Sequence, residues 1–353
     1  MVKGASMQTS LQHNDWKETE VRWGIERRPM VLLHPLAVVA LIFLLSASVV
    51  FGTEDTPCKK TGVVLQILGS GGPVGWDERA SSGYLVWGNG RPHIMIDAGG
   101  GTFLRLHQAG ARVKDLKVLS ISHFHPDHAS ELPALLWSGT LSGMKNLVVS
   151  GPSGSAAIPG LKDFLDALFQ TKAGAFPWSK LSGRAPKLQA VETDVQRSSP
   201  VEIYKDADLR VTAIGVPHAH LPTLGYRVDM GGVSVGFGAD QAGTGADYTG
   251  FSRAFVRLVQ GVDVLVMHFA ISEEVKGGPI RFHAKPSVVG KIAQAAGVRM
   301  LVLSHLFKVD NNPNFSLANL ASNLAHVKNH YSGTVVIAED LKCIEVKKIA
   351  KQQ

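Results

Sequence analysis

The chain concentrates metal-ligand side chains in one short stretch, residues 120–133, which reads SISHFHPDHASELP. His123, His125, Asp127 and His128 lie within it, directly after an apolar run. Imidazole nitrogens and carboxylate oxygens are suitable ligands for zinc and for similar divalent metals. In extended backbone, positions 123 and 125 point the same way, whereas 127 and 128 come a turn later and can face a neighbouring position. The pattern therefore predicts that one loop supplies ligands to two metals.

Further ligand-type residues follow predicted strands elsewhere in the chain. They are Asp97 after HIMI, His218 in VPHAHLP, Asp240 after VSVGFGA, and His305 in MLVLSHL. Because strand ends converge on one edge in layered α/β folds, we expect these side chains to lie near the histidine-rich loop.

Two more histidines compete for a place in the predicted site. His220 stands two positions after His218, so in extended backbone both would point to the same side and either could be a ligand. His268, in VLVMHFA, also follows a predicted strand. We predict that it lies in the core or contacts the ligands, and does not bind a metal itself.

The string H-x-H-x-D-H resembles the signature of the metallo-β-lactamase fold superfamily, and the segments around the later residues resemble its other motifs across residues 63–347. This resemblance implies an α/β fold, a four-layer αβ/βα sandwich with two mixed sheets face to face and helices outside. It also implies a role for each candidate: His123, His125 and His218 hold the first metal, Asp127, His128 and His305 hold the second, Asp240 bridges them, and Asp97 orients the loop. The spacing from His218 to Pro222 favours His218 over His220 in this comparison.

Other strings are similar to the ribonuclease Z and phosphodiesterase-like branch of that superfamily. They are ILGSGGP (67–73), RASSGYLV (79–86), GPSG (151–154) and LGYRV (224–228). In that branch a histidine opens a helix before the last ligand. Here it is His283, which would protonate the leaving oxygen, and Asp127 would be catalytic as well as a ligand. The transfer-RNA enzymes read H-E-A-T where this chain has His268-Phe269-Ala270-Ile271. The resemblance therefore supports the fold and the metal chemistry more strongly than it supports a transfer-RNA substrate.

The predicted chemistry is hydrolysis. Two divalent metals, zinc above all and Mn²⁺ or Fe²⁺ as alternatives, would turn a shared water into a hydroxide that attacks an ester. We predict a metallo-hydrolase for small anionic esters of the phosphodiester type; lactones, sulfate esters and β-lactams could use the same machinery. The superfamily also contains redox proteins and inactive binding modules. The chain has no cysteine pattern for the first, and its filled ligand positions argue against the second.

The overall charge of +7 is a mild excess spread along the chain. The chain contains no basic arm that could bind a folded RNA. Nucleic acid stays a possible partner, but the charge distribution does not support it. A homodimer is also possible. With 45% hydrophobic and 18% charged residues, the chain can bury a sizeable core.

The N-terminal region predicts export. Residues 1–29 form a polar leader that ends in Arg27-Arg28-Pro29, and residues 30–52 are almost wholly apolar. Such a segment is typical of a signal peptide or an N-terminal membrane anchor, which would place the protein in a bacterial periplasm or on the inner membrane. The two cysteines, Cys58 and Cys343, would then form a disulfide or remain two unpaired thiols, and both readings stay open.

Residues 62–348 are predicted to form one catalytic domain in which strands and helices alternate. Within it, residues 170–200 are rich in Gly, Pro, Lys and Ser, which predicts an irregular insertion that could act as a lid. The next strand is expected at 208–216.

Overall fold

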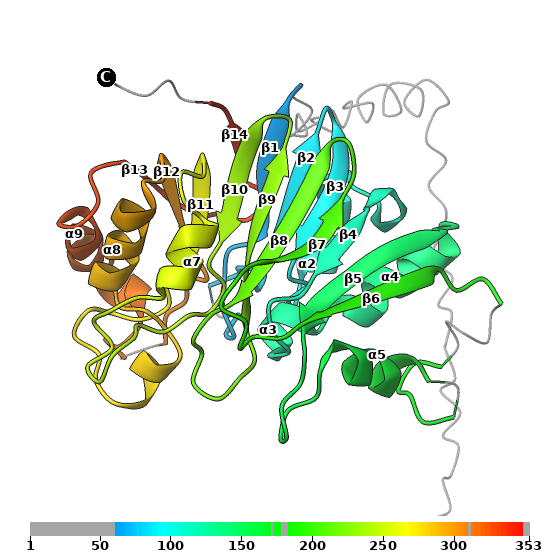
Figure 1. The fold of residues 1–353 in the computed structure, drawn as a ribbon, viewed down its shortest axis with the longest axis horizontal. Coiled ribbons are helices and arrows are strands. Elements are labelled where there is room, and N and C mark those ends of the chain that lie inside the picture. The colour runs from blue at the N-terminus through cyan, green and yellow to red at the C-terminus, as the bar shows by residue number, and fades with distance from the viewer. Residues whose placement is uncertain (1–60, 76, 171, 178–182, 310–311, 349–353) are drawn as a thin grey trace, which may run out of the picture. The chain divides into compact units, whose positions relative to one another are not determined.

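The computed structural model describes residues 61–75, 77–170, 172–177, 183–309 and 312–348 (Figure 1). The predicted leader 1–29, the apolar segment 30–52 and Cys58 lie outside the described residues. Export, anchoring and pairing of Cys58 with Cys343 therefore stay predictions. Among the described residues, no helix combines the length and the apolar character needed to cross a membrane.

The first sheet has seven strands in the order β14-β1-β2-β3-β4-β5-β6. Their bounds are β1 Val63–Gly69, β2 Gly83–Gly88, β3 Arg91–Ile96, β4 Val118–Ser120, β5 Asn146–Pro152, β6 Lys187–Thr193 and β14 Cys343–Val346. The pairs from β14 to β3 are antiparallel, and those from β3 to β6 are parallel.

The second sheet also has seven strands, in the order β13-β12-β11-β10-β9-β8-β7. They are β7 Val201–Lys205, β8 Leu209–Gly215, β9 Leu224–Met230, β10 Val233–Phe237, β11 Val264–His268, β12 Met300–Ser304 and β13 Thr334–Ile337. Strands β7 to β10 pair antiparallel, and β10 to β13 pair parallel.

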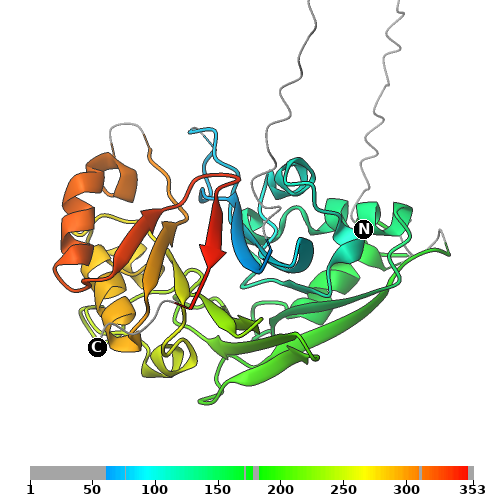
Figure 2. The same ribbon diagram turned by 90° about the horizontal axis from the view of Figure 1, so that it is seen from above.

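The sheets pack face to face, and helices cover their outer faces (Figures 1 and 2). Between the sheets, Ile67 and Val86 of the first lie in one apolar cluster with Val211, Tyr226 and Phe237 of the second. Helices α2 (Thr102–Gln108), α4 (Leu132–Leu141) and α5 (Leu161–Phe169) pack on the first sheet. Helices α7 (Arg253–Leu258), α8 (Pro286–Ala296) and α9 (Leu320–Lys328) pack on the second. The short elements are α3 Pro126–Ala129, η1 Val113–Asp115, η2 Gly278–Arg281 and η3 Ser316–Asn319. Amphipathic strands and helices stack in four layers, which confirms the predicted sandwich.

Two edge strands, β6 and β7, show that part of the earlier prediction was wrong. Residues 170–200 were predicted to be an irregular insertion, with the next strand at 208–216. Strand β6 pairs in parallel with β5 along its whole length, and β7 pairs antiparallel with β8. Both are edge strands with many half-exposed side chains, so their sequences lack a clear apolar pattern. Backbone pairing to a neighbour distant in sequence defines them. Residues 172–177 and 183–186 are irregular, as predicted.

The carboxyl ends of several strands point to one edge of the sandwich. Strands β3 and β4 are parallel. Strands β8, β10, β11 and β12 also run in one direction, because β9 is antiparallel to both β8 and β10. Each of these strands is followed by a loop that carries one of the predicted site residues, so the topology gathers those loops together.

Candidate metal centre

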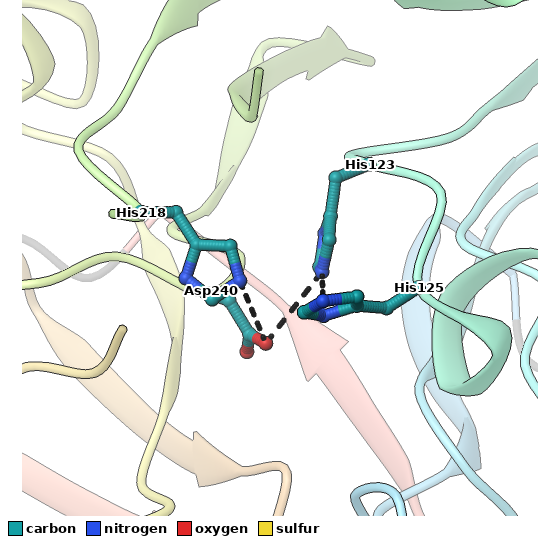
Figure 3. A group of neighbouring side chains, drawn as sticks. All are labelled: His123, His125, His218 and Asp240. Carbon is teal, nitrogen blue, oxygen red and sulfur yellow. Dashed lines mark hydrogen bonds and ion pairs between the residues drawn. The ribbon is translucent and has the colours of Figure 1, made fainter. Parts of the chain in front are cut away.

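A first cluster brings together His123, His125, His218 and Asp240 (Figure 3). One ligand atom from each side chain lies within 4.8 Å of all the others. Oδ2 of Asp240 is 3.7 Å from Nε2 of His123 and 3.7 Å from Nε2 of His218. Nε2 of His123 lies 3.0 Å from Nδ1 of His125. Three imidazoles and one carboxylate therefore converge on a common point.

A second cluster shares Asp240 and adds His128, His268 and His305. Asp240 Oδ2 is 3.5 Å from His128 Nε2, and its Oδ1 is 3.4 Å from His305 Nε2. Asp127 lies here too, with Oδ2 at 3.1 Å from His305 Nε2 and 3.5 Å from His128 Nε2. Asp240 thus stands between two groups of ligand-type atoms, where a bridging carboxylate is expected.

Buried hydrogen bonds from Asp97 hold the histidine-rich loop in shape. Its carboxylate accepts from the Ser122 backbone N–H at 2.7 Å, from Ser122 Oγ at 3.0 Å, and from Nδ1 of His128 at 2.8 Å. Because a carboxylate accepts here, Nδ1 of His128 must carry the proton, and its Nε2 lone pair faces the cluster. The family resemblance implied a loop-orienting role for Asp97, and these hydrogen bonds fit that role.

Outer partners fix the other rings in the same sense. His218 Nδ1 donates to the Phe282 carbonyl oxygen at 2.7 Å, and His123 Nδ1 lies 3.0 Å from Ser122 Oγ. The Nε2 atoms of His128 and His218 are buried and have no hydrogen-bond partner among the described residues. A buried nitrogen without a partner is costly, and a divalent cation would satisfy it. The nitrogen and carboxylate donors present therefore fit a zinc-like ion.

The electrostatics favour the ligand forms of the two carboxylates and of His218, but the protonated form of His128. Burial would raise the pKa of Asp127 and Asp240, but the histidines beside them outweigh burial and hold the pKa of both carboxyls well below the usual range. Burial lowers the pKa of His218 to about 4. The pKa of His128 is raised well above its usual value because Asp127 and Asp240 outweigh its burial, so metal binding there would release a proton.

Comparison with known proteins identifies the family. A profile described as "Beta-lactamase superfamily domain" matches residues 93–306. The chain belongs to the beta-lactamase superfamily. An uncharacterised protein of Mycobacterium bovis is 31% identical over 256 residues, covering 69% of this chain and 81% of that protein. Ribonuclease Z of Thermobifida fusca is 26% identical over 327 residues, covering 80% of this chain and 94% of that enzyme.

Solved structures of the superfamily share the fold. Human tRNase Z, short form, matches with a TM-score of 0.60 and 19% identity, over 80% of this chain and 99% of that one. Yeast PDE1 matches with a TM-score of 0.58 and 12% identity, over 80% and 99%. At such identities the structures speak for the fold alone. The profile and the sequence relatives confirm the predicted superfamily, and the relatives named ribonuclease Z support its ribonuclease Z-like branch.

The structure separates His218 from its competitor, His220. Ala219 has a φ of 49°, so the chain turns there and does not run extended. The side chains at 218 and 220 consequently diverge. His218 is buried in the first cluster, while His220 is exposed and belongs to neither cluster.

His268 lies close enough to the second cluster to be a candidate ligand, yet both of its nitrogens already have partners. Nδ1 is 2.6 Å from Asp240 Oδ1, and Nε2 is 3.1 Å from the hydroxyl of Tyr84. Tyr84 in turn donates to Ser304 Oγ at 2.9 Å. We therefore retain the prediction that His268 contacts the ligands and does not bind a metal itself.

Sequence reasoning missed three outer partners: Ser122, Tyr84 and the carbonyl of Phe282. Only Ser122 carries a signal, since a small polar residue stands directly before the first ligand. Tyr84 looks like any inward residue of a strand, and a carbonyl group leaves no mark in a sequence.

Left-handed backbone at Ala219 gives a test of local strain. This conformation costs an L-residue about 1–2 kcal/mol, and glycine is free of that cost. Ala219→Gly is expected to raise the free energy of unfolding by about 1 kcal/mol in urea denaturation. The control is the same substitution at exposed Ala325, inside α9, which should lower it by about 1 kcal/mol. Equal losses at both positions would contradict the assigned strain.

Proposed function

We propose that the chain is a metal-dependent hydrolase that cleaves phosphodiesters with two divalent ions, zinc above all, held by the two clusters. One observation carries this proposal: Asp240 lies between two groups of ligand atoms, as a dinuclear centre requires. The resident ions would supply a nucleophilic water at neutral pH and neutralise charge on the reacting phosphoryl group.

The protein's own residues prepare the reaction around those ions. His123, His125 and His218 would hold one ion, and Asp127, His128 and His305 the other. Asp97 and the Phe282 carbonyl fix the rings, so little reorganisation is needed when a substrate arrives. His283 is proposed to protonate the leaving oxygen.

A polar pocket gives the substrate a place beside the first cluster. It has a volume of about 550 Å³ and is lined by Ser155, Asp194, Gln196, His218 and His220, among others. Hydroxyl, amide and imidazole groups can contact the polar parts of an ester. This lining fits a small, polar diester more closely than an apolar substrate.

The test combines metal content with substrate choice. The full chain, purified with zinc, is expected to hold about two ions by mass spectrometry and to hydrolyse bis(p-nitrophenyl) phosphate. A chelator should abolish turnover, and added zinc should restore it. RNA is the second diester to test, since relatives named ribonuclease Z match most of the chain.

Other outcomes would change the proposal. Two bound ions with turnover of a chromogenic β-lactam, lactone or sulfate ester, and none of the diesters, would replace the substrate class. A folded protein that binds no metal would contradict the site itself.

A further inference from the structure

A second hollow, the α4–α5 groove, lies between α4, α5 and the segment 172–177. It has a volume of about 720 Å³, and its walls include Ala129, Trp137, Phe164, Leu168 and Phe176. None of the described residues that line it is charged. The volume falls in the range of small-molecule sites, and the lining is apolar, as in most of them.

Two half-exposed stripes at helical spacing form these walls. On α4 they are Pro133 and Trp137, and on α5 they are Phe164 and Leu168. Each helix also buries apolar residues, such as Leu136 and Leu165, against the first sheet. Phe164 and Leu168 pack against the margin of that core and stay half-exposed, and apolar surface that remains exposed commonly marks a binding site.

One loop, residues 123–130, contributes both to the metal centre and to the groove. Ala129 and Ser130 line the groove and directly follow the cluster residue His128. Phe124, which stands between two other cluster residues, stacks on Phe164 with ring centroids 4.5 Å apart and an angle of 16°. Neighbouring residues of one loop thus line the groove and hold the cluster, and this adjacency favours one ligand that reaches both.

We propose that the α4–α5 groove binds an aromatic group of the ester substrate while the anionic ester lies at the metal centre. This inference rests on the proposed function and narrows its substrate class. Three aromatic side chains, Trp137, Phe164 and Phe176, line the groove. Aromatic rings gain additional stabilisation from offset or edge packing on one another. Because the described lining is uncharged, the anionic part of the substrate would be bound by the metals and the polar pocket, and not by the groove.

The test uses three p-nitrophenyl esters that share a leaving group: those of phenylphosphonic, hexylphosphonic and methylphosphonic acid. The native protein should show a kcat/KM about tenfold to a hundredfold higher for the phenyl than for the methyl ester. Leu168→Ser should reduce that ratio at least about threefold, and Phe164→Leu should reduce the preference for phenyl over hexyl. Leu104→Ser, at a residue 60% exposed on α2, is the matched control and should leave the ratio unchanged.

Binding separates failure of the groove from failure of the proposed function. If no ester is turned over, titration calorimetry with phenylphosphonate and methylphosphonate is the deciding measurement. Tighter binding of phenylphosphonate by the native protein, with the difference lost in Leu168→Ser, would support the groove even without hydrolysis. Equal affinities, or equal turnover of all three esters, would overturn it. So would a preference for hexyl over phenyl, or a dimer that Leu168→Ser dissociates, since a second copy would then occupy the groove.

Discussion

Asp240→Ala is expected to lose hydrolysis by about a thousandfold or more and to retain less than about one metal ion per chain. The reason is the position of this carboxylate, which lies within 3.7 Å of ring nitrogens from both clusters. Removing it deprives both ions of a ligand and leaves like charges without neutralisation. Mass spectrometry of the purified variant and turnover of the diester measure the two effects separately.

Asp263→Ala is the matched control for this change. Asp263 is also a buried aspartate of the second sheet, but it accepts from the Ser234 backbone N–H at 2.8 Å and pairs with Arg299. Its removal should lower the free energy of unfolding by about 2 kcal/mol and leave kcat and metal content intact. If Asp240→Ala kept both ions, or if both variants lost activity in proportion to stability, the bridging role would be contradicted.

The sequence predicted most of the elements that carry the site, because those elements are buried strands followed by short loops. Strands β4 and β12, which precede the histidine-rich loop and His305, are two examples. Both have uninterrupted apolar centres between polar residues, the pattern that single sequences show best. The ligand-type residues could be named for the same reason, since each follows such a strand.

The errors share a physical cause, which is that pairing between distant segments leaves little trace in local composition. Strand β6 was predicted as part of an irregular insertion because only one of its seven side chains is buried. Its regular structure comes from hydrogen bonds to β5, which lies about forty residues earlier. The competition between His218 and His220 was similar, because the turn at Ala219 that separates them is set by backbone conformation.

The same limit applies to the α4–α5 groove. The sequence shows that α4 and α5 carry apolar residues at helical spacing, but it does not show which of them the core leaves uncovered. Only packing on the first sheet reveals that Trp137 and Phe164 remain half-exposed while Leu136 and Leu165 are buried. A residue's place in the core is decided by its neighbours, so specificity is harder to predict than metal binding.

His283→Gln is expected to slow hydrolysis according to the leaving group. His283 faces Asp240, with Nδ1 at 3.6 Å from Oδ1, and this nitrogen has no hydrogen-bond partner among the described residues. It belongs to neither metal cluster. A dinucleotide, whose leaving alkoxide needs a proton, should lose about a hundredfold to ten-thousandfold in kcat. Bis(p-nitrophenyl) phosphate should lose less than about tenfold, since p-nitrophenolate leaves without a proton.

The pH profile gives the second readout of the same variant. Burial lowers the pKa of His283 to about 3 in the isolated site, and the negative charge of a bound diester would raise it again. A general acid works only while protonated. Dinucleotide turnover by the native protein should therefore fall as pH rises through the pKa that His283 has in the complex with the diester. His283→Gln should remove this fall, while His330→Gln, at an exposed residue beyond α9, should keep it. Only proton transfer distinguishes the two leaving groups. An equal loss of kcat for both esters in His283→Gln, with a changed metal content, would therefore contradict the general-acid role and make His283 a residue that supports the metal centre.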